Sequence, residues 1–221
     1  MSRGALLYSV FQVLALLTAF LLRKPSPLPP KQRWVITIAA LFGAGVGAKL
    51  PFVLLSKEPF FSGPAWFTDG KTILSGIAGG YLCVELAKLL FGIRAKTGDG
   101  FAMPLAAAVA VGRWGCFFNG CCGAPVVPVI ESGFHAAMAA VLWKLRDVDA
   151  LRWQLLKLYL IAYCAFRFGV EFLRTEPRLA WGLTGYQFGA AAMAAVLALL
   201  WVVDAWLKSL PPAPAADRLG S

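Results

Sequence analysis

The feature that most constrains this chain is a series of long apolar runs separated by basic, glycine-rich or proline-rich segments. Seven runs cover residues 4–22, 34–55, 72–91, 101–111, 127–143, 153–173 and 180–207. Several approach the ~20 residues that a helix needs to cross a bilayer. The chain is 59% hydrophobic and only 14% charged, which is unlike an ordinary soluble domain. We therefore expect an all-α, polytopic membrane protein with about seven transmembrane helices.

The distribution of basic residues predicts how these helices are oriented. The loops after the first, third, fifth and seventh runs carry more Lys and Arg than the opposite set, eleven against six. This bias places the C-terminus in the cytoplasm and the N-terminus outside. The net charge of +10 is then explained by cytoplasmic loops, and no nucleic-acid partner is expected. The first run lacks a small-residue cleavage site, so we expect it to be retained as a span.

The runs form one unit, and we expect a single transmembrane domain over residues 1–208. Residues 209–221 are rich in proline and are expected to form a disordered cytoplasmic tail. We expect a multi-pass protein of the bacterial inner (cytoplasmic) membrane.

The most unusual stretch is GRWGCFFNGCCG at residues 112–123, which lies between two apolar runs. It combines Arg113 and Asn119 with three cysteines and four glycines. An arginine offers a planar fork of donors that suits phosphate or carboxylate, and glycine allows close backbone approach. On spacing alone, two interpretations stay open, a site for a polar lipid headgroup and a tight structural loop.

Charged residues inside the apolar runs give a second signal, because each costs about 2.5–3.5 kcal/mol to insert without a partner. Glu131 and His135 are four residues apart, as are Arg167 and Glu171, so each pair shares a helix face. Together with Arg113 they predict an arginine-rich polar cluster suited to an anionic headgroup. The alternative is a bundle held together by ion pairs. Four other charges lie near the predicted cytoplasmic ends, where we expect pairing or snorkelling, namely Glu85, Lys88, Lys157 and Asp204.

The chain resembles the prolipoprotein diacylglyceryl transferase family in six blocks that occur in the same order. The blocks are GAGVGAKL at 43–50, LSGIAGG at 74–80, GDGFAMP at 98–104, GRWGCFFNGCCG at 112–123, FRFGVEFLR at 166–174 and GLTGYQ at 182–187. The resemblance implies an enzyme that moves a diacylglyceryl group from phosphatidylglycerol to the cysteine thiol of a prolipoprotein at the outer face, with glycerol phosphate leaving. It implies no cofactor.

The resemblance also implies roles for individual residues. Arg113 and Arg167 would hold the donor phosphate, Asn119 would contact the headgroup, Glu171 would orient Arg167, and Arg174 would face the outer entrance. Two arginines can stabilise the charge that develops on a leaving phosphate without a metal. The catalytic candidates are Arg113, Arg167, Glu171, His135, Cys116 and Cys121. The substrate-binding candidates are Lys49, Ser75, Gly76, Asn119, Glu131 and Arg174.

The sequence departs from the family pattern at four of these positions. Lys49 stands where the family has arginine, Ser75 where it has histidine, Cys116 where it has asparagine and Cys121 where it has glutamate. The resemblance therefore leaves open which group takes the proton of the acceptor and whether the acceptor is a prolipoprotein.

The cysteines of the motif admit several interpretations. A disulfide from Cys116 to Cys121 or Cys122 is the leading prediction, because the outer compartment can oxidise thiols. A catalytic thiolate with His135 as base is an alternative, and inert thiols are another. His135 itself is more often an interhelical hydrogen-bonding group than a base. No metal site is expected, because C-x4-C-C is not a usual zinc spacing and the chain has one histidine.

Three functions remain open at this stage. The leading one is the lipid transfer described above, to a prolipoprotein or to a different acceptor. The second is a non-catalytic phospholipid-binding or assembly protein that kept the headgroup site. The third is a thiol–disulfide membrane protein that uses Cys116, Cys121 and Cys122.

Overall fold

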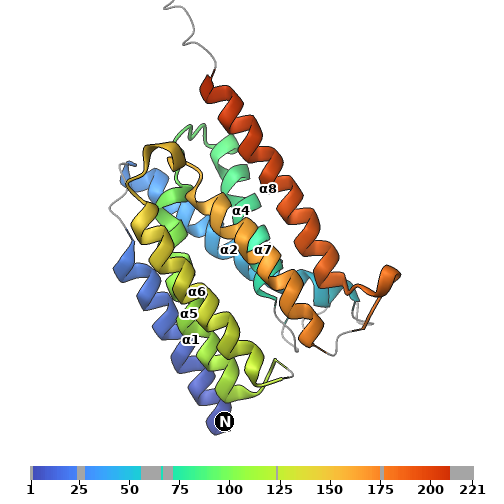
Figure 1. The fold of residues 1–221 in the computed structure, drawn as a ribbon. Coiled ribbons are helices and arrows are strands. Elements are labelled where there is room, and N and C mark those ends of the chain that lie inside the picture. Colours follow the sequence, from blue (N-terminus) through green and yellow to red (C-terminus); the bar gives the residue numbers. More distant parts are fainter. Residues whose placement is uncertain are drawn as a thin grey trace, which may run out of the picture.

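The computed structural model describes residues 2–23, 28–55, 66, 72–122, 124–174 and 177–209. Within these ranges the regular structure is helical, with one isolated β-bridge between Arg178 and Thr184. The elements are α1 (Arg3–Leu22), α2 (Pro30–Leu55), α4 (Ile73–Leu90), α5 (Gly98–Asn119), α6 (Val126–Leu145), η1 (Asp149–Leu151), α7 (Leu155–Val170), η2 (Glu171–Leu173), η3 (Ala180–Gly182) and α8 (Gly185–Ser209) (Figure 1). The all-α prediction is confirmed.

Six of these helices are long and apolar enough to cross a membrane, namely α1, α2, α4, α5, α6 and α8. Large apolar side chains cover their outer surfaces, including Leu21, Leu89 and Leu199, which are 77%, 81% and 63% exposed. In water such a surface would be costly, but it suits contact with lipid. The chain is a multi-pass membrane protein. The count of seven spans stays a prediction, because α7 has 16 residues, fewer than a bilayer crossing normally needs. The orientation of the termini also stays a prediction.

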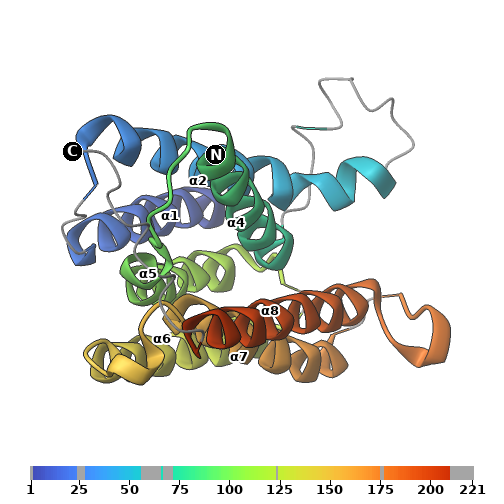
Figure 2. The same cartoon turned by 90° about the horizontal axis from the view of Figure 1, so that it is seen from above.

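The helices pack largely as neighbouring pairs, with α2 against α4, α1 against α5, α5 against α6 and α7 against α8 (Figures 1 and 2). The α2–α4 pair approaches very closely, because a Cβ added at Gly43 or Gly47 would collide with the backbone of α4. Small residues allow this kind of contact between membrane helices. The most buried core lies between α5, α6 and α7, where Ala102, Leu142 and Tyr159 are at most 1% exposed.

The fourth apolar run, expected at residues 101–111, is longer than predicted. Helix α5 continues to Asn119 and so includes residues 112–119 of the GRWGCFFNGCCG stretch, which are helical and not a loop. Two glycines of the stretch serve helix packing, because Gly112 and Gly115 face α1, and a Cβ at Gly115 would lie 3.1 Å from the Tyr8 carbonyl oxygen. Packing against α1 therefore compensates for the poor helix propensity of these glycines.

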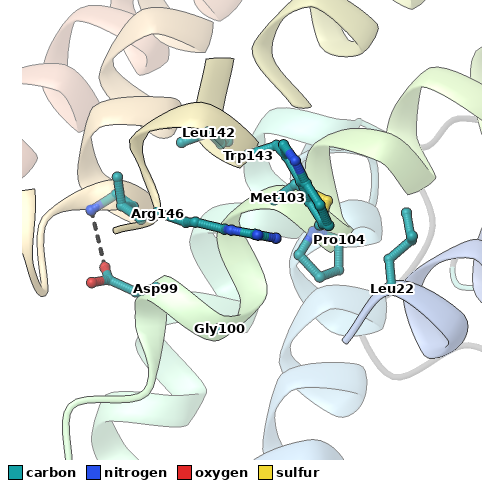
Figure 3. Close-up of a pocket in the computed structure, with 9 residues that line it drawn as sticks. Leu22, Asp99, Gly100, Met103, Pro104, Leu142, Trp143 and Arg146 are labelled. Atoms are coloured by element: carbon teal, nitrogen blue, oxygen red, sulfur yellow. Dashed lines mark hydrogen bonds between the residues drawn. The ribbon is translucent and has the colours of Figure 1, made fainter. Parts of the chain in front are cut away.

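Polar contacts tie the helices together at the end of the bundle where α5 begins. Asp99 accepts hydrogen bonds from the backbone amides of Trp153 and Leu155, the latter at 3.0 Å, and thereby caps the start of α7. Figure 3 shows Asp99 in a small pocket next to Trp143 and Arg146. Lys157 pairs with Asp204 and donates to Gln154 at 2.8 Å. Lys96 also pairs with Asp204, at 2.8 Å.

We call Lys96, Gln154, Lys157 and Asp204 the lysine cluster. The predicted pairing of end-of-helix charges is confirmed there, and also for Lys88 with Glu85 at 2.8 Å.

Candidate functional site

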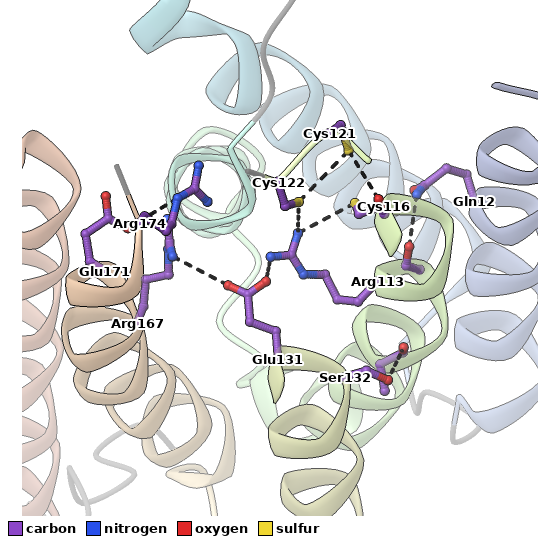
Figure 4. A network of polar contacts seen from close by, with 12 residues as sticks. Gln12, Arg113, Cys116, Cys121, Cys122, Glu131, Ser132, Arg167, Glu171 and Arg174 are labelled. Carbon is purple, nitrogen blue, oxygen red and sulfur yellow. Dashed lines mark hydrogen bonds and ion pairs between the residues drawn. The ribbon is translucent and has the colours of Figure 1, made fainter. Parts of the chain in front are cut away.

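The end of α5 places an arginine inside the bundle and turns the chain back over it. Arg113 lies on the last turns of α5 and is 7% exposed. The helix ends at Gly120, whose φ of 65° and ψ of 20° are left-handed and favour glycine. This reversal brings Cys121 and Cys122 back toward Arg113, which donates to the sulfurs of Cys116 and Cys122 at 3.6 and 3.7 Å (Figure 4).

A chain of ion pairs runs from Arg113 across three helices. Glu131, near the start of α6, pairs with Arg113 and lies 3.6 Å from a terminal nitrogen of Arg167 on α7. Arg167 pairs with Glu171 at 2.6 Å, and Arg174 lies 3.8 Å from the same carboxylate. We call these five residues the arginine cluster. The predicted pairing of Arg167 with Glu171 is confirmed, and the structure joins it to Arg113 and Glu131.

The start of α8 holds Glu171 in place. Thr184 directly precedes the first residue of α8. Its backbone N–H donates a hydrogen bond to Gln187 Oε1 at 2.9 Å. The Gln187 amide donates in return to Thr184 Oγ1 at 3.3 Å, which forms a capping box. The Thr184 hydroxyl then donates to Glu171 Oε1 at 3.1 Å. The helix cap thus orients the carboxylate that orients Arg167.

The arginine cluster carries more positive than negative charge in a buried place. Three arginines face two glutamates, which leaves a formal charge of +1. Arg113 Nε and Arg167 Nη1 are buried without a hydrogen-bond partner among the described residues, as are both carboxylate oxygens of Glu131 and Oε2 of Glu171. Unpaired buried donors are costly, and an anion with several acceptor oxygens would satisfy them. The cluster is therefore suited to bind a phosphate group.

The disulfide predicted within the motif is wrong, because all five cysteines of the chain are free thiols in the structure. A disulfide needs two sulfurs about 2.05 Å apart, and Cys116 is bonded to neither Cys121 nor Cys122. Burial raises the pKa of the Cys121 thiol. The pKa of Cys122 is lowered to about 5, first because Cys116 donates a hydrogen bond to it and also because Arg113 lies beside it.

The three sulfurs of Cys116, Cys121 and Cys122 lie within 4.8 Å of one another, close enough to ligate one metal ion. Burial decreases from Cys122, which is buried, through Cys116 to Cys121, which is exposed. The group therefore opens to the surface at Cys121.

The structure places His135 in the core and not beside a cysteine. Its Nδ1 shares a 2.8 Å hydrogen bond with the hydroxyl of Tyr159, and its ring packs on Phe134 and Tyr163. Its Nε2 is buried without a partner among the described residues. No contact described here joins His135 to a thiol, and its place between α6 and α7 agrees with the interhelical hydrogen-bonding interpretation.

Four of the substrate-binding candidates are not among the five residues of the arginine cluster. Lys49 is half-buried on α2. Ser75 and Gly76 lie on α4 at the α2–α4 contact, where Gly76 packs on Ala48. The Ser75 hydroxyl oxygen is buried without a partner in the described part of the chain. Asn119 is exposed at the end of α5 and is hydrogen-bonded to Cys121.

Sequence reasoning gave no role to three residues at the start of α8. Thr184 and Gln187 form the cap that holds Glu171, and the ring of Tyr186 lies 5.4 Å from the Arg167 guanidinium and 5.8 Å from that of Arg174. The signal was present, because a Thr three residues before Gln, just ahead of an apolar run, is the pattern of a capping box.

Comparison with known proteins identifies the family of the chain. The family model for prolipoprotein diacylglyceryl transferase (LGT) matches residues 5–206. A curated relative, phosphatidylglycerol–prolipoprotein diacylglyceryl transferase 2 of Clostridium perfringens (strain 13 / Type A), is 26% identical over 175 residues, which cover 66% of this chain and 68% of the relative. No solved structure matches the chain. Because the family match extends over nearly all the helices that build the arginine cluster, the chain belongs to the prolipoprotein diacylglyceryl transferase family and is a transferase enzyme.

Proposed function

We propose that the protein transfers a diacylglyceryl group from phosphatidylglycerol to the cysteine thiol of a prolipoprotein, at the outer face of the bacterial inner membrane. The thiol loses its proton to solvent, a C–S bond forms at the glyceryl carbon, the C–O bond to the phosphate breaks, and glycerol phosphate leaves. The name of the Clostridium perfringens relative states this donor and this acceptor class for that protein. Residues 1–208 would form the transmembrane domain, with the N-terminus outside, and residues 209–221 a cytoplasmic tail, most of which lies outside the described residues.

The observation that carries the proposal is the buried arginine cluster with its excess positive charge. A phosphodiester brings one negative charge, and the leaving glycerol phosphate gains another as the C–O bond breaks. Donors aimed at developing charge in a water-poor site contribute more than they do in water. Arg113 and Arg167 each keep a buried nitrogen without a hydrogen-bond partner in the described chain, and these donors are available to the leaving group.

The two glutamates act as positioning residues in this scheme. Glu131 lies between Arg113 and Arg167, and Glu171 is fixed by Thr184 and pairs with Arg167. They keep two like charges close together while the site is empty, which would otherwise be unfavourable. The diacyl chains would enter laterally from the lipid that surrounds the helices.

The test measures both products in one assay. The purified protein is placed in nanodiscs that contain phosphatidylglycerol with a labelled headgroup, together with a prolipoprotein peptide. Released glycerol phosphate and the mass of the peptide are followed together. We expect release coupled to the mass gain of one diacylglyceryl group, and neither product when the peptide cysteine is replaced by serine.

Matched arginine variants complete the test. Arg113→Ala should reduce transfer by at least about 100-fold, the loss typical of removing one charge-stabilising donor. Arg146→Ala is the control, because Arg146 lies after α6 and pairs only with its neighbour Asp147 at 3.1 Å among the ion pairs described. Release without peptide modification would indicate another acceptor or water. Lipid binding without release would contradict catalysis and favour a binding role.

A further inference from the structure

We propose that Cys116, Cys121 and Cys122 bind one zinc ion beside the arginine cluster and that the fourth position on this ion receives the thiol of the acceptor. The first half of the proposal concerns a metal site and stands independently of the enzyme's substrate. The second half rests on the proposed function, because it names the acceptor cysteine as the incoming ligand.

The geometry of the three sulfurs carries the metal site. Zinc–sulfur bonds of about 2.3 Å place two sulfurs on the same ion about 3.8–4.0 Å apart at tetrahedral or trigonal angles. The Cys121 and Cys122 sulfurs are 4.0 Å apart, and all three sulfurs lie within 4.8 Å of one another. The spacing C-x4-C-C is unusual for zinc in a sequence, but the left-handed turn at Gly120 folds it into one cluster.

Two of the three sulfurs have a cationic donor beside them. Arg113 donates to the sulfurs of Cys116 and Cys122 at 3.6 and 3.7 Å. Donors of this kind orient and stabilise anionic ligands in metal sites. Figure 4 shows the Arg113 guanidinium between the sulfurs on one side and Glu131 on the other. Arg113 would therefore lie between the metal and Glu131.

Charge balance favours a divalent ion. The arginine cluster has a formal charge of +1. Three thiolates would bring the total to −2, and one divalent cation would return it to zero in a place where net charge is costly. Thiolate ligands select zinc among the common divalent ions. Three protein ligands with an open fourth position are also the pattern of a reactive zinc site and not of a structural one.

The exposure of the three cysteines indicates where the open position lies. Cys122 is buried and Cys121 is exposed, so the cluster opens toward the surface on the Cys121 side. A thiol that enters there would displace a zinc-bound water, form a Zn–S bond and release its proton to solvent. A coordinated thiol is deprotonated by the metal, so the acceptor would become a nucleophile without a histidine or carboxylate base at this position.

Zinc binding is measured first on the full-length reduced protein in detergent, with a chromophoric zinc chelator as competitor. We expect one ion per chain. Cys116→Ser, Cys121→Ser and Cys122→Ser should each weaken binding by more than about 100-fold, the upper end of the effect of losing only an outer-shell partner. Cys83→Ser is the matched control, because Cys83 is a half-buried thiol on α4 outside the cluster, and it should bind zinc normally.

The acceptor position is then tested with cobalt in place of zinc. Adding the prolipoprotein peptide should increase the sulfur-to-cobalt charge-transfer absorption, and the serine form of the peptide should leave the spectrum unchanged. Stoichiometric zinc with no spectral response would overturn the acceptor half of the proposal. Diacylglyceryl transfer by a protein that binds no zinc above the level of the cysteine variants would overturn the whole proposal and leave the proposed function intact. Absence of transfer with normal zinc and peptide binding would contradict the proposed function alone.

Discussion

The two polar ends of the α5–α8 bundle differ in how completely their charges are satisfied. They are about 20 Å apart, because Asp99 and Arg113 are separated by 14 residues of one helix. In the lysine cluster, each charged side chain forms an ion pair, and the side chains of Asp204 and Lys96 are also partly exposed to solvent. In the arginine cluster, Glu131 and Glu171 are at most 1% exposed, and donors remain unpaired in the described chain.

This difference distinguishes the lysine cluster, which stabilises the fold, from the arginine cluster, which is suited to bind a ligand. Both ends join helices that are distant in sequence, and both contain ion pairs. Of the two clusters, only the arginine cluster combines burial of Arg113, Glu131, Arg167 and Glu171 with unsatisfied donors and an excess of positive charge. Polar groups that only stabilise a fold are expected to satisfy one another, whereas a site for an anion keeps donors available. Each of the following predictions tests this comparison.

The largest effect on stability is expected for Glu131→Gln. The change leaves Arg113 and Arg167 buried side by side without their shared counter-charge, and removing one partner of a buried pair costs about 3–5 kcal/mol. The matched change at the other end, Lys96→Gln, removes a pair that is 42% exposed on the lysine side and should cost about 0–1 kcal/mol. Denaturant unfolding in detergent micelles measures both. Equal losses would remove the distinction between the two ends.

A smaller effect, on activity more than on folding, is expected for Arg167→Lys. Lysine keeps the charge but cannot contact Glu131 and Glu171 through two separate nitrogens. Loss of the Nη1 donor that the proposed mechanism directs at the leaving phosphate costs ~1.5–3 kcal/mol, which corresponds to roughly 10–150-fold in the rate of transfer. The rate of glycerol phosphate release in nanodiscs gives the result, with Lys157→Arg at the lysine cluster as the control. An unchanged rate would show that Arg167 is structural.

Tyr159→Phe tests the hydrogen bond between Tyr159 and His135, which belongs to neither cluster. The change removes the hydroxyl that contacts His135 Nδ1 at 2.8 Å and leaves that nitrogen buried without its partner. We expect a loss of about 1–3 kcal/mol in the free energy of unfolding. If His135 acts only through packing and this hydrogen bond, activity per folded molecule should stay within about twofold of the unchanged protein. A loss of activity in a stably folded variant would instead assign His135 a part in the reaction.

The smallest signal is the titration of a single thiol. The pKa of Cys122 is lowered to about 5 and that of Cys121 is raised, so in metal-free protein Cys122 should become a thiolate above about pH 5 while Cys121 stays protonated at neutral pH. The ultraviolet thiolate absorbance should therefore rise as the pH increases through about 5. This rise should be absent in Cys122→Ser and present in Cys121→Ser. A rise only at alkaline pH would contradict the stabilising effect of Arg113 and Cys116.

Much of the fold and part of the site could be predicted from the sequence. Continuous apolar runs specify membrane helices, and a four-residue spacing specifies that Arg167 and Glu171 meet on one face. Such signals are local, and local spacing is read directly from the chain. The glycine-rich motif indicated Arg113, and a charged residue in an apolar run indicated Glu131.

The remaining features depend on three-dimensional packing. The extent of α5 was underestimated, because the glycines of the motif read as loop residues until α1 is seen against them. The predicted disulfide from Cys116 was wrong, because cysteines that are close in sequence need not bring their sulfurs to bonding distance. The role of Thr184 was missed, because its hydroxyl reaches Glu171 across a connection whose path the sequence does not specify.

The contact between α1 and α5 also has a consequence for how the protein is made. Gln12 on α1 donates to the Gly112 carbonyl oxygen at 3.4 Å, next to the arginine that anchors the cluster, and the two residues are 100 positions apart. Ribosomes add about 5–20 residues per second. The first helix therefore waits about 5–20 s in the membrane before its partner has been synthesised. During biogenesis α1 is an early, unpaired surface, and the cluster cannot be completed until translation has passed Arg174.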